Sequence, residues 1–468
     1  MDLRPMIGAR HFRRGRPSAR GDLASVIALD PAAAARTARP TLRVAHFTDT
    51  YLPRRDGVVT SLQSLTAAMS ELGHSSLLVV PRHPDQPADE ELLRLRSLPC
   101  GVAQFRLAAW PRSRHVERVA HWLPHVVHVH TPGPVGLLGI FAARRLGLPL
   151  VQTYHTDLRA YADAYRLPTP VIEGVLRCYA RRLGSPKLEL PHGADRTARR
   201  DALVDAGTGL LLADADAVLV PTSAILTRCR LPIDDDRIYV APTGVSLHDV
   251  PADAGPEFRR RYGIGPDEPV VVFVGRVNRE KGIDLLTDAF GRLRGVVPAA
   301  RLVLVGAVYE PRWVQRLLEQ AGIADRVVLT GQLPPAEVAA AYAASDVFAF
   351  PSLTDTQGLV VQEAALAGLP AVLADEALYS TGPLAGTGVL AGPDPMRYAE
   401  ALEDLLTNPV RRAHVGEEAR RRARHNSPSE YARRMAAIYG QAVRRAGSAT
   451  RLSRGERRGP FRSRRLIA

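Results

Sequence analysis

Two cationic residues follow a strongly apolar segment at a spacing that suits a diphosphate. Residues 270–276 read Val-Val-Val-Phe-Val-Gly-Arg, and Lys281 and Gly282 follow shortly after Arg276. The Arg276 guanidinium can bind phosphate oxygens as a fork and the Lys281 ammonium can act as a point charge, so together they can neutralise a leaving pyrophosphate. Lys281 stands out because Lys187 is the only other lysine among 62 basic residues. The pattern predicts an anion site after this segment.

A polar loop in the second half of the chain runs into a helix that we expect to start at Gly358. The backbone amides of Leu359 and Val360 have no partner within the first turn of such a helix, and the helix dipole favours an anion there. Asp355 lies in the loop and Glu363 lies on the helix. Carboxylates accept hydrogen bonds from paired hydroxyls, so both residues suit a sugar or a ribose.

Gly57 lies between the first expected strand and the helix that follows it. A glycine at this position lets backbone amides approach a phosphate, and the helix start adds favourable charge. Glycine at such a turn is more often only structural, and no GxGxxG fingerprint of a dinucleotide site occurs in the chain. Phosphate contact and a structural turn are both retained as interpretations of Gly57.

Histidines follow two further expected strands. His128 and His130 share one face of a strand and resemble metal ligands, but no third ligand is evident in the sequence. We therefore predict no metal site, with His128 buried in the sheet and His130 facing the cleft, where a neutral imidazole can donate a hydrogen bond or handle a proton. Tyr154 and His155 follow the next strand and are candidates for contact with an acceptor or a sugar.

The elements that position these residues form two series of strands alternating with helical patterns, which is typical of parallel α/β layers. The expected strands of the first series are 42–47, 76–80, 126–130, 150–153, 217–221 and 238–241. Those of the second series are 270–274, 302–305, 327–330, 347–350, 371–374 and 388–390. This predicts an α/β protein of two doubly wound, Rossmann-like domains that face each other across a cleft and bind ligands at the carboxyl ends of their strands.

The domain boundaries follow from composition. A Pro-, Gly- and Asp-rich stretch, residues 242–265, reads as the interdomain linker. We expect the following parts: a basic disordered tail over 1–40, a first Rossmann-like domain over 41–245, a second Rossmann-like domain over 246–425, a helix over 426–446 that returns to the first domain, and a second basic disordered tail over 447–468.

Composition excludes several classes of protein. The 468 residues are 46% hydrophobic and 24% charged, and no apolar run approaches the roughly 18 residues of a membrane-spanning helix. Three widely spaced cysteines indicate neither a disulfide framework nor a zinc site, so we expect a reducing cytoplasm. Of the net charge of +14, the tails carry +5 and +6, which leaves about +3 for the body. A body this balanced is not expected to bind nucleic acid.

Taken together, these motifs resemble those of the retaining, nucleotide-sugar-dependent glycosyltransferases of family 4, which have the GT-B architecture. The resemblance covers residues 41 to about 440 and rests on a Gly-Arg pair, then a Lys-Gly pair, then an acidic residue eight positions before a glutamate. It implies that the catalytic residues are His130, Arg276, Lys281 and Asp355. It also implies that the donor is held by Gly57, Arg276, Lys281, Asp355, Gly358, Leu359, Val360 and Glu363. The donor is a co-substrate, and no cofactor is implied.

The resemblance also implies that residues 41–245 form the acceptor domain and residues 246–425 the nucleotide-sugar domain. Arg276 and Lys281 are expected to hold the diphosphate, Glu363 the ribose, and Asp355 the transferred sugar. Two departures from the family pattern favour an alternative, a sugar-nucleotide-binding protein with weak catalysis. Asp355 stands where the family usually has Glu, and the loop 379–388 lacks the usual Gly-Gly and acidic pattern.

The subgroup resembles enzymes that glycosylate membrane lipids, including diacylglycerol glycosyltransferases and phosphatidylinositol mannosyltransferases. The resemblance is carried by residues 49–51, 57–61, 154–156 and 356–359. A basic and aromatic segment, residues 105–122, could bind an anionic membrane surface or could be an ordinary solvated helix. We therefore expect a hexosyltransferase that is cytoplasmic and peripheral on the inner face of the cell membrane, with a lipid acceptor or, alternatively, a soluble one.

Overall fold

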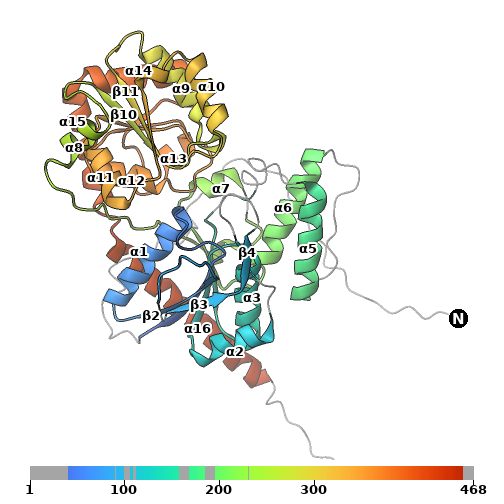
Figure 1. Cartoon of the computed structure of the whole chain (residues 1–468). Coiled ribbons are helices and arrows are strands. Elements are labelled where there is room, and N and C mark those ends of the chain that lie inside the picture. The colour runs from blue at the N-terminus through green and yellow to red at the C-terminus, as the bar shows by residue number, and fades with distance from the viewer. Residues whose placement is uncertain are drawn as a thin grey trace, which may run out of the picture.

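A computed structural model describes most of the chain between the two tails. The described residues are 41–89, 91–99, 106–108, 112–155, 158, 168–184, 196–229 and 231–456, the last ten by their backbone alone. They form two α/β domains, each built on a parallel sheet (Figure 1). The expected tail over 1–40 and residues 457–468 lie outside the described residues. The remainder of the second expected tail, 447–456, continues the last helix and so differs from the disorder that we expected.

The first domain contains a seven-stranded sheet in the order β3-β2-β1-β6-β7-β8-β9, in which every pairing is parallel. Its strands are β1 (Arg43–Phe47), β2 (Ser75–Pro81), β3 (Leu92–Leu95), β6 (Val126–Val129), β7 (Leu150–Thr153), β8 (Ala217–Val220) and β9 (Ile238–Val240). Its helices are α1 (Gly57–Glu71), α2 (Ser113–His121), α3 (Pro134–Leu146), α5 (Thr169–Leu183), α6 (Arg196–Leu212) and α7 (Ala224–Arg228). A short antiparallel ribbon, β4 (Ser97–Pro99) and β5 (Arg106–Ala108), lies beside this sheet.

The second domain contains a six-stranded parallel sheet in the order β12-β11-β10-β13-β14-β15. Its strands are β10 (Val270–Val274), β11 (Arg301–Val305), β12 (Val327–Gly331), β13 (Val347–Phe350), β14 (Ala371–Leu373) and β15 (Val389–Leu390). Its helices are α8 (Ala254–Arg261), α9 (Ile283–Leu293), α10 (Pro311–Gln320), α11 (Pro335–Ala343), α12 (Leu359–Leu366), α13 (Glu376–Ser380), α14 (Pro395–Thr407) and α15 (Pro409–Ala423). Helix α8 lies inside the stretch that we expected to be a linker.

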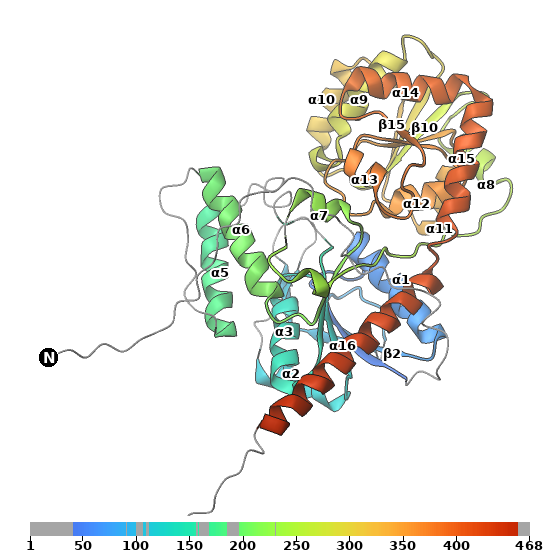
Figure 2. The same ribbon diagram turned by 180° about the vertical axis from the view of Figure 1, so that it is seen from behind.

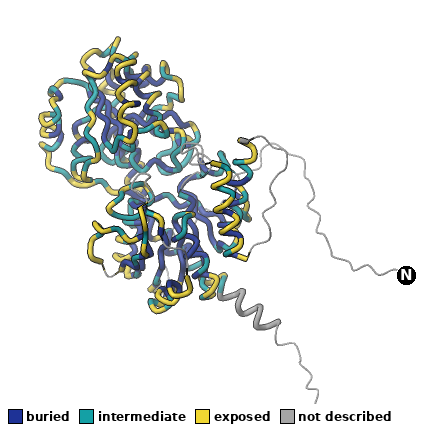
Figure 3. The backbone as a smooth tube through the Cα atoms, turned by 45° about the vertical axis from the view of Figure 1, so that its right-hand side comes forward, coloured by how far each residue is buried: buried dark blue, intermediate teal, exposed yellow. Residues whose placement is uncertain are grey.

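All of the expected strands are present, and β3, β4 and β5 are additional. Most of the predicted strands are buried apolar runs, as the dark interior of each domain shows (Figure 3). Strand β3 lies at the sheet edge and pairs only with β2, and its short sequence includes Arg94. A strand this short that is interrupted by a charged residue offers no apolar run from which it could be predicted, whereas the edge strands β9, β12 and β15 were predicted.

The last helix, α16 (Pro428–Glu456), packs on the first domain although the second domain precedes it in sequence (Figure 2). Tyr431, Met435, Ile438 and Tyr439 are buried in one cluster with residues of β1, β6 and β7. Burying each large apolar side chain contributes about 1.5–3 kcal/mol. The helix is therefore part of the core of the first domain.

The chain crosses between the domains twice, near Thr243 and near Asn426. The Asn426 amide donates to the Thr243 carbonyl at 2.7 Å, and the Gln357 side chain bonds both the N–H and the carbonyl of Thr243 at 2.8 Å. Gly244 lies so close to the second crossing that an added Cβ would be 2.2 Å from the Ser427 carbonyl oxygen. The two crossings form one packed junction.

Candidate active site

The order of strands in each sheet indicates where a ligand binds. In the first sheet the chain builds outward from β1 to β2 and β3, then returns to place β6 on the other side of β1. The second sheet repeats this reversal between β10 and β13. Open α/β sheets bind ligands at such switch points, beyond the carboxyl ends of the strands. Most of the residues expected to hold the donor follow β10 and β13, whereas Gly57 follows β1 and His130 follows β6.

The loop that carries Asp355 belongs to the second domain but is hydrogen-bonded to the first. Thr356 Oγ1 donates to the His155 carbonyl oxygen at 2.9 Å, and Thr222 Oγ1 donates to the Thr356 carbonyl oxygen at 2.6 Å. Arg228 Nη1 donates to the Asp355 carbonyl oxygen at 2.9 Å. These bonds bring the predicted residues of the two domains into one site.

Lys281 and Arg276 each face a carboxylate. Lys281 Nζ lies 2.7 and 2.8 Å from the two carboxylate oxygens of Asp355. Arg276 Nη2 lies 2.9 Å from the carboxylate of Glu280, and Lys281 Nζ lies 3.9 Å from the same group. All four side chains are at most 26% exposed. The two cations and two carboxylates form a neutral cluster that an incoming diphosphate would have to rearrange.

The electrostatics of this cluster keep Asp355 ionised. Burial alone would raise the pKa of the Asp355 carboxyl, but the ion pair with Lys281 and the nearby Arg276 hold its pKa below the usual value. Glu280 was not predicted as a site residue. Its spacing was a usable signal, because it lies four positions after Arg276 and adjoins Lys281.

Helix α12 begins after Gly358, which adopts the left-handed conformation with φ of 67°. Glycine takes this conformation without the strain that a side chain would add. An added Cβ would also lie 3.0 Å from the ring of Phe350. The structure thus places Leu359 and Val360 in the first turn of a helix, where N–H groups lack intrahelical partners.

Glu363 accepts a hydrogen bond from the Tyr342 hydroxyl at 3.1 Å. Burial raises the pKa of the Glu363 carboxyl, and this hydrogen bond acts in the opposite direction. Tyr342 lies on α11 and was not predicted, because nothing in the local sequence connects it to α12. It fixes the carboxylate that the resemblance assigns to the ribose.

His130 differs in one respect from our expectation. It is 2% exposed, and both of its ring nitrogens face other histidines. His46 Nδ1 lies 3.0 Å from His130 Nε2, and His130 Nδ1 lies 3.1 Å from His155 Nε2. His130 therefore does not present a free nitrogen to the cleft, and the more exposed His155 is the outer ring of the three.

His128 is fully buried, as expected, and bonds the hydroxyls of Thr153 and Tyr439 at 2.7 Å each. The structure also supplies the third possible metal ligand that the sequence did not reveal, because ligand atoms of His46, His128 and His130 lie within 4.8 Å of one another. The register pairs His46 with His128 on neighbouring strands. Both nitrogens of His128 and both of His130 already have hydrogen-bond partners, so the cluster fits a hydrogen-bonded network better than a metal centre.

Gly57 is the first residue of α1, and its surroundings leave open space where a Cβ would lie. The Asp56 carboxylate caps the helix by accepting from the Val59 N–H at 3.0 Å, and Arg54 pairs with the same carboxylate at 2.8 Å. A phosphate near Gly57 would therefore meet a negative charge that Arg54 offsets. Phosphate contact at Gly57 stays a prediction.

A pocket of about 510 Å³, including its open mouth, lies in the first domain beside the histidines. His130, Tyr154 and His155 line it, together with Ile140, Leu211 and Leu212. The Tyr154 ring is 8% exposed and packs in an apolar cluster, and its hydroxyl accepts from the Leu158 N–H at 3.3 Å. The pocket combines imidazoles with an apolar wall.

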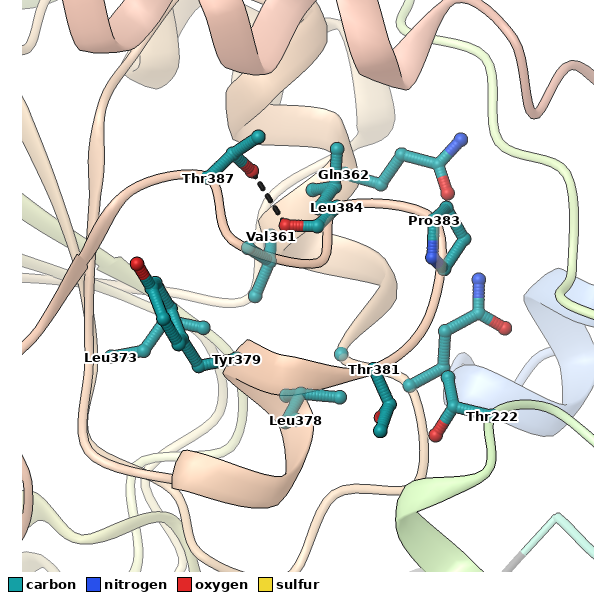
Figure 4. Close-up of a pocket in the computed structure, with 12 residues that line it drawn as sticks. Thr222, Val361, Gln362, Leu373, Leu378, Tyr379, Thr381, Pro383, Leu384 and Thr387 are labelled. Carbon is teal, nitrogen blue, oxygen red and sulfur yellow. Dashed lines mark hydrogen bonds between the residues drawn. The ribbon is translucent and has the colours of Figure 1, made fainter. Parts of the chain in front are cut away.

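A second pocket, of about 390 Å³ including open space, lies beside the start of α12 (Figure 4). Thr222 of the first domain lines it together with the loop 379–388. Gly386 N–H donates to the Tyr379 carbonyl oxygen at 2.8 Å, and Thr387 Oγ1 donates to the Leu384 carbonyl oxygen at 2.7 Å. This loop departs from the family pattern and is closed by its own hydrogen bonds.

The segment 105–122 is described in part; Phe105 and Trp110 lie outside the described residues. Trp122 is half-buried against the core, with the Arg43 guanidinium 4.5 Å from its ring centroid. Leu98 and Leu107 pair across the β4–β5 ribbon and are 75% and 59% exposed. No helix among the described residues is long and apolar enough to span a bilayer.

Comparisons with known proteins agree with this architecture. Residues 55–249 match the model of Glycosyltransferase Family 4, and residues 255–422 match that of Glycosyl transferases group 1. A D-inositol 3-phosphate glycosyltransferase of Xylanimonas cellulosilytica is 34% identical over 79% of this chain and 82% of its own length. An alpha-monoglucosyldiacylglycerol synthase of Streptococcus pneumoniae is 27% identical over 71% of this chain and 70% of its own.

Solved structures show the same fold. Sucrose-phosphate synthase of Thermosynechococcus elongatus matches with a TM-score of 0.63 at 22% identity, over 86% of this chain and 98% of its own. Anabaena HepE in complex with UDP-glucose matches with a TM-score of 0.63 at 16% identity, over 86% of this chain and all of its own. The sequence relatives and this shared fold confirm the resemblance, and the chain belongs to the family 4 glycosyltransferases of the GT-B fold.

Proposed function

We propose that this glycosyltransferase transfers a hexose from a nucleotide-diphosphate sugar to a hydroxyl of a membrane lipid, with retention of the anomeric configuration. The observation that supports the donor most strongly is the cluster of Lys281, Arg276 and Asp355 beside the start of α12. Cations next to a helix start suit a diphosphate, and a carboxylate next to them suits the hydroxyls of the transferred sugar.

In the proposed step, the bond between the anomeric carbon and the diphosphate oxygen breaks and the acceptor oxygen forms the new bond. Negative charge develops on the leaving diphosphate, where Lys281, Arg276 and the amides of Leu359 and Val360 stabilise it. Such preorganised charge is usually the largest single contribution to a transfer of this kind. The acceptor proton leaves with the diphosphate or with solvent.

Binding of the donor requires an exchange of partners. Lys281 is bound to both oxygens of Asp355 before the donor arrives. Diphosphate oxygens replace Asp355 as the partners of Lys281, and the released carboxylate turns to the sugar hydroxyls. Glu363, held by Tyr342, accepts from the ribose hydroxyls.

The acceptor lies against the first domain. The pocket beside His155 offers an apolar wall for a lipid and imidazole nitrogens for polar atoms. Exposed Leu98 and Leu107 and the basic residues of the tails suit an anionic membrane surface on the inner face of the cell membrane. Two relatives named alpha-monoglucosyldiacylglycerol synthase support a lipid acceptor.

A soluble acceptor is the second candidate, because the relative with 34% identity is named for D-inositol 3-phosphate. The third candidate is a sugar-nucleotide-binding protein with weak catalysis, motivated by Asp355 and by the loop 379–388. These candidates share the donor site and differ in the step after donor binding.

One assay separates the three. The full chain is incubated with UDP-, GDP- and ADP-hexoses and with either vesicles of diacylglycerol and phosphatidylinositol or soluble inositol 3-phosphate. Labelled sugar in the lipid fraction supports the proposal, and labelled sugar on inositol phosphate alone supports the second candidate. Saturable donor binding without transfer or hydrolysis supports the third.

A further inference from the structure

We propose that Gln357 is a positioning residue for the transfer reaction. Through Thr243, it fixes the start of helix α12, where the diphosphate is expected to bind, relative to the first domain. The identity of the substrates rests on the proposed function, whereas the contacts of Gln357 do not. We call the side chains of Gln357, Gln362 and Asn426, together with the backbone of Thr243, the amide cluster.

The amide cluster is buried at the junction where the chain crosses between the domains. Its four members are at most 8% exposed. The Gln357 side chain accepts from the Thr243 N–H and donates to the Thr243 carbonyl oxygen, each at 2.8 Å. Buried backbone groups need hydrogen-bond partners, and the next strand of a sheet often supplies them. At Thr243 a side chain that directly precedes α12 supplies them instead.

The second crossing completes the amide cluster. Asn426 Nδ2 donates to the Thr243 carbonyl oxygen at 2.7 Å and to Gln362 Oε1 at 3.0 Å, and Gln362 Nε2 donates to the Asn426 carbonyl oxygen at 2.8 Å. The Thr243 carbonyl oxygen thus accepts two hydrogen bonds, which uses both of its lone pairs. Gln362 lies within α12. The two crossings therefore hold this helix both at its start and along its length.

Helix α1 of the first domain is bonded to the same crossing. Ser61 Oγ lies 2.7 Å from Thr243 Oγ1, and Ser64 Oγ donates to the Gly244 carbonyl oxygen at 2.6 Å. Helices α1 and α12 are thus connected through two adjacent residues of the chain. Hydrogen-bonded networks that are buried and satisfied are rigid, so this connection fixes the position of α12 relative to α1.

The loop before α12 carries this connection to the groups expected to act on the donor. Asp355, Thr356 and Gln357 are consecutive, and each bonds a residue of the first domain or of the first crossing. Gly358 follows directly, and α12 begins after it. A displaced Gln357 would therefore move both the Asp355 carboxylate and the first turn of α12 relative to the acceptor side.

Transfer and hydrolysis of the donor differ in their demand on this position. Transfer requires that the donor and the acceptor are aligned, whereas hydrolysis requires only the donor and water. If Gln357 contributed to stability alone, its loss would lower both rates by the same factor, because both come from the same folded molecules. The ratio of transfer to hydrolysis therefore reports on position and not on stability.

The first test needs no substrate. Amide hydrogen exchange of the full chain is followed by mass spectrometry in wild type, Gln357→Met and Ser64→Ala. Methionine has a similar length but cannot form the two bonds to Thr243, so exchange should become faster over α12 and stay at the wild-type rate over α9. Ser64→Ala removes a bond to the same crossing from the side of α1, so its α12 should exchange as in wild type. Unchanged exchange of α12 in Gln357→Met would overturn the proposal.

The second test measures the ratio of sugar transferred to sugar released by hydrolysis, with the donors and acceptors of the assay above. Gln357→Met should lower this ratio by up to about 100-fold, the loss that a misplacement of about 1 Å can cause. Ser64→Ala should keep the ratio within about twofold of wild type, because it leaves the bonds of Gln357 in place. A ratio within about twofold of wild type in Gln357→Met would exclude a positioning role.

Gln357→Asn is the second variant if Gln357→Met does not fold. Its amide is one methylene shorter, so it stays polar but cannot keep both 2.8 Å contacts to Thr243. It should change the exchange of α12 and the ratio in the same direction, and wild-type results in both measurements would contradict the proposal. If the wild-type chain transfers sugar to neither acceptor, the proposed function fails, and the exchange of α12 alone decides the role of Gln357.

Discussion

The two domains contribute side chains of different charge to the site. The second domain presents charged groups, in which Lys281 pairs with Asp355 and Arg276 pairs with Glu280. The first domain presents neutral groups, the imidazoles of His46, His130 and His155, whose pKa values burial keeps low. A leaving diphosphate gains charge during the reaction, whereas an acceptor hydroxyl arrives uncharged. Each domain therefore matches the charge of the part of the substrate that is proposed to lie against it.

Substitution of Lys281 should have the largest effect on transfer. Replacing Lys281 with Ala should reduce transition-state stabilisation by about 2–4 kcal/mol, or roughly 30- to 1,000-fold in kcat, because it removes a preorganised charge. Steady-state kinetics of transfer measure this loss. Arg279→Ala is the matched control, because Arg279 lies on the same turn, is 56% exposed and stacks on Trp313. A Lys281→Ala enzyme within threefold of wild type would exclude the residue from the site.

Substitution of Asp355 tests whether the transferred sugar and the diphosphate are bound by different residues. Asp355→Asn should reduce turnover by about 1.5–3 kcal/mol, as for hydrogen bonds to a charged group. Binding of the nucleoside diphosphate should not weaken, because the phosphates and the ribose are assigned to residues other than Asp355. Calorimetry and kinetics measure the two effects separately, and Asp355→Glu, which restores the usual family residue, is the control. Parallel losses of binding and turnover would contradict the division.

The neutral imidazole of His46 predicts that the free energy of unfolding depends on pH. His46 has an ordinary pKa near 6.5 when unfolded and about 3 when folded, so the unfolded chain binds the additional proton. The resulting stability is fully present above pH 6.5 and is lost as the pH falls towards 3, by about 1.4 kcal/mol per pH unit.

His46→Asn removes this titration and should flatten the dependence by that amount. Denaturant unfolding between pH 7.5 and pH 5, followed by the signal of the first domain, measures the slope. Identical slopes in wild type and His46→Asn would show that His46 does not remain neutral in the folded protein.

The smallest effect concerns the tails. Removing residues 1–40 and 457–468 removes +5 from each end while keeping all of α16. Each basic residue near an anionic leaflet contributes up to about 1 kcal/mol, so the trimmed chain should bind phosphatidylglycerol vesicles more weakly and keep its hydrolysis of the donor. Vesicle sedimentation at low and high salt measures the binding, and release of free sugar measures the hydrolysis. If the full chain does not bind these vesicles at low salt, the tails do not tether the protein to the membrane.

Much of the fold could be predicted because its signals are local. Apolar runs such as 270–274 end in a glycine, and the polar residues that follow them lie where parallel strands place a ligand. Arg276, Lys281 and Asp355 were therefore found from spacing alone, and the structure brings them together.

The parts of the fold and the site that could not be predicted depend largely on contacts between segments that are distant in the sequence. His46 meets His128 and His130 only through the register of β1 against β6, and Tyr342 reaches Glu363 from a separate helix. The exposure of His130 was overestimated because its strand position does not reveal the ring of His155 in front of it. The helical part of the second tail was missed because its composition is basic and poor in apolar residues.

The anomeric configuration of the first product distinguishes retention from inversion. The full chain is given the nucleotide-sugar that raises its melting temperature most, with lipid acceptor vesicles, and the first product is examined by ¹H NMR before any later exchange. We expect release of the nucleoside diphosphate and a product whose anomeric configuration equals that of the donor. A product of inverted configuration, or donor binding without any transfer, would contradict it.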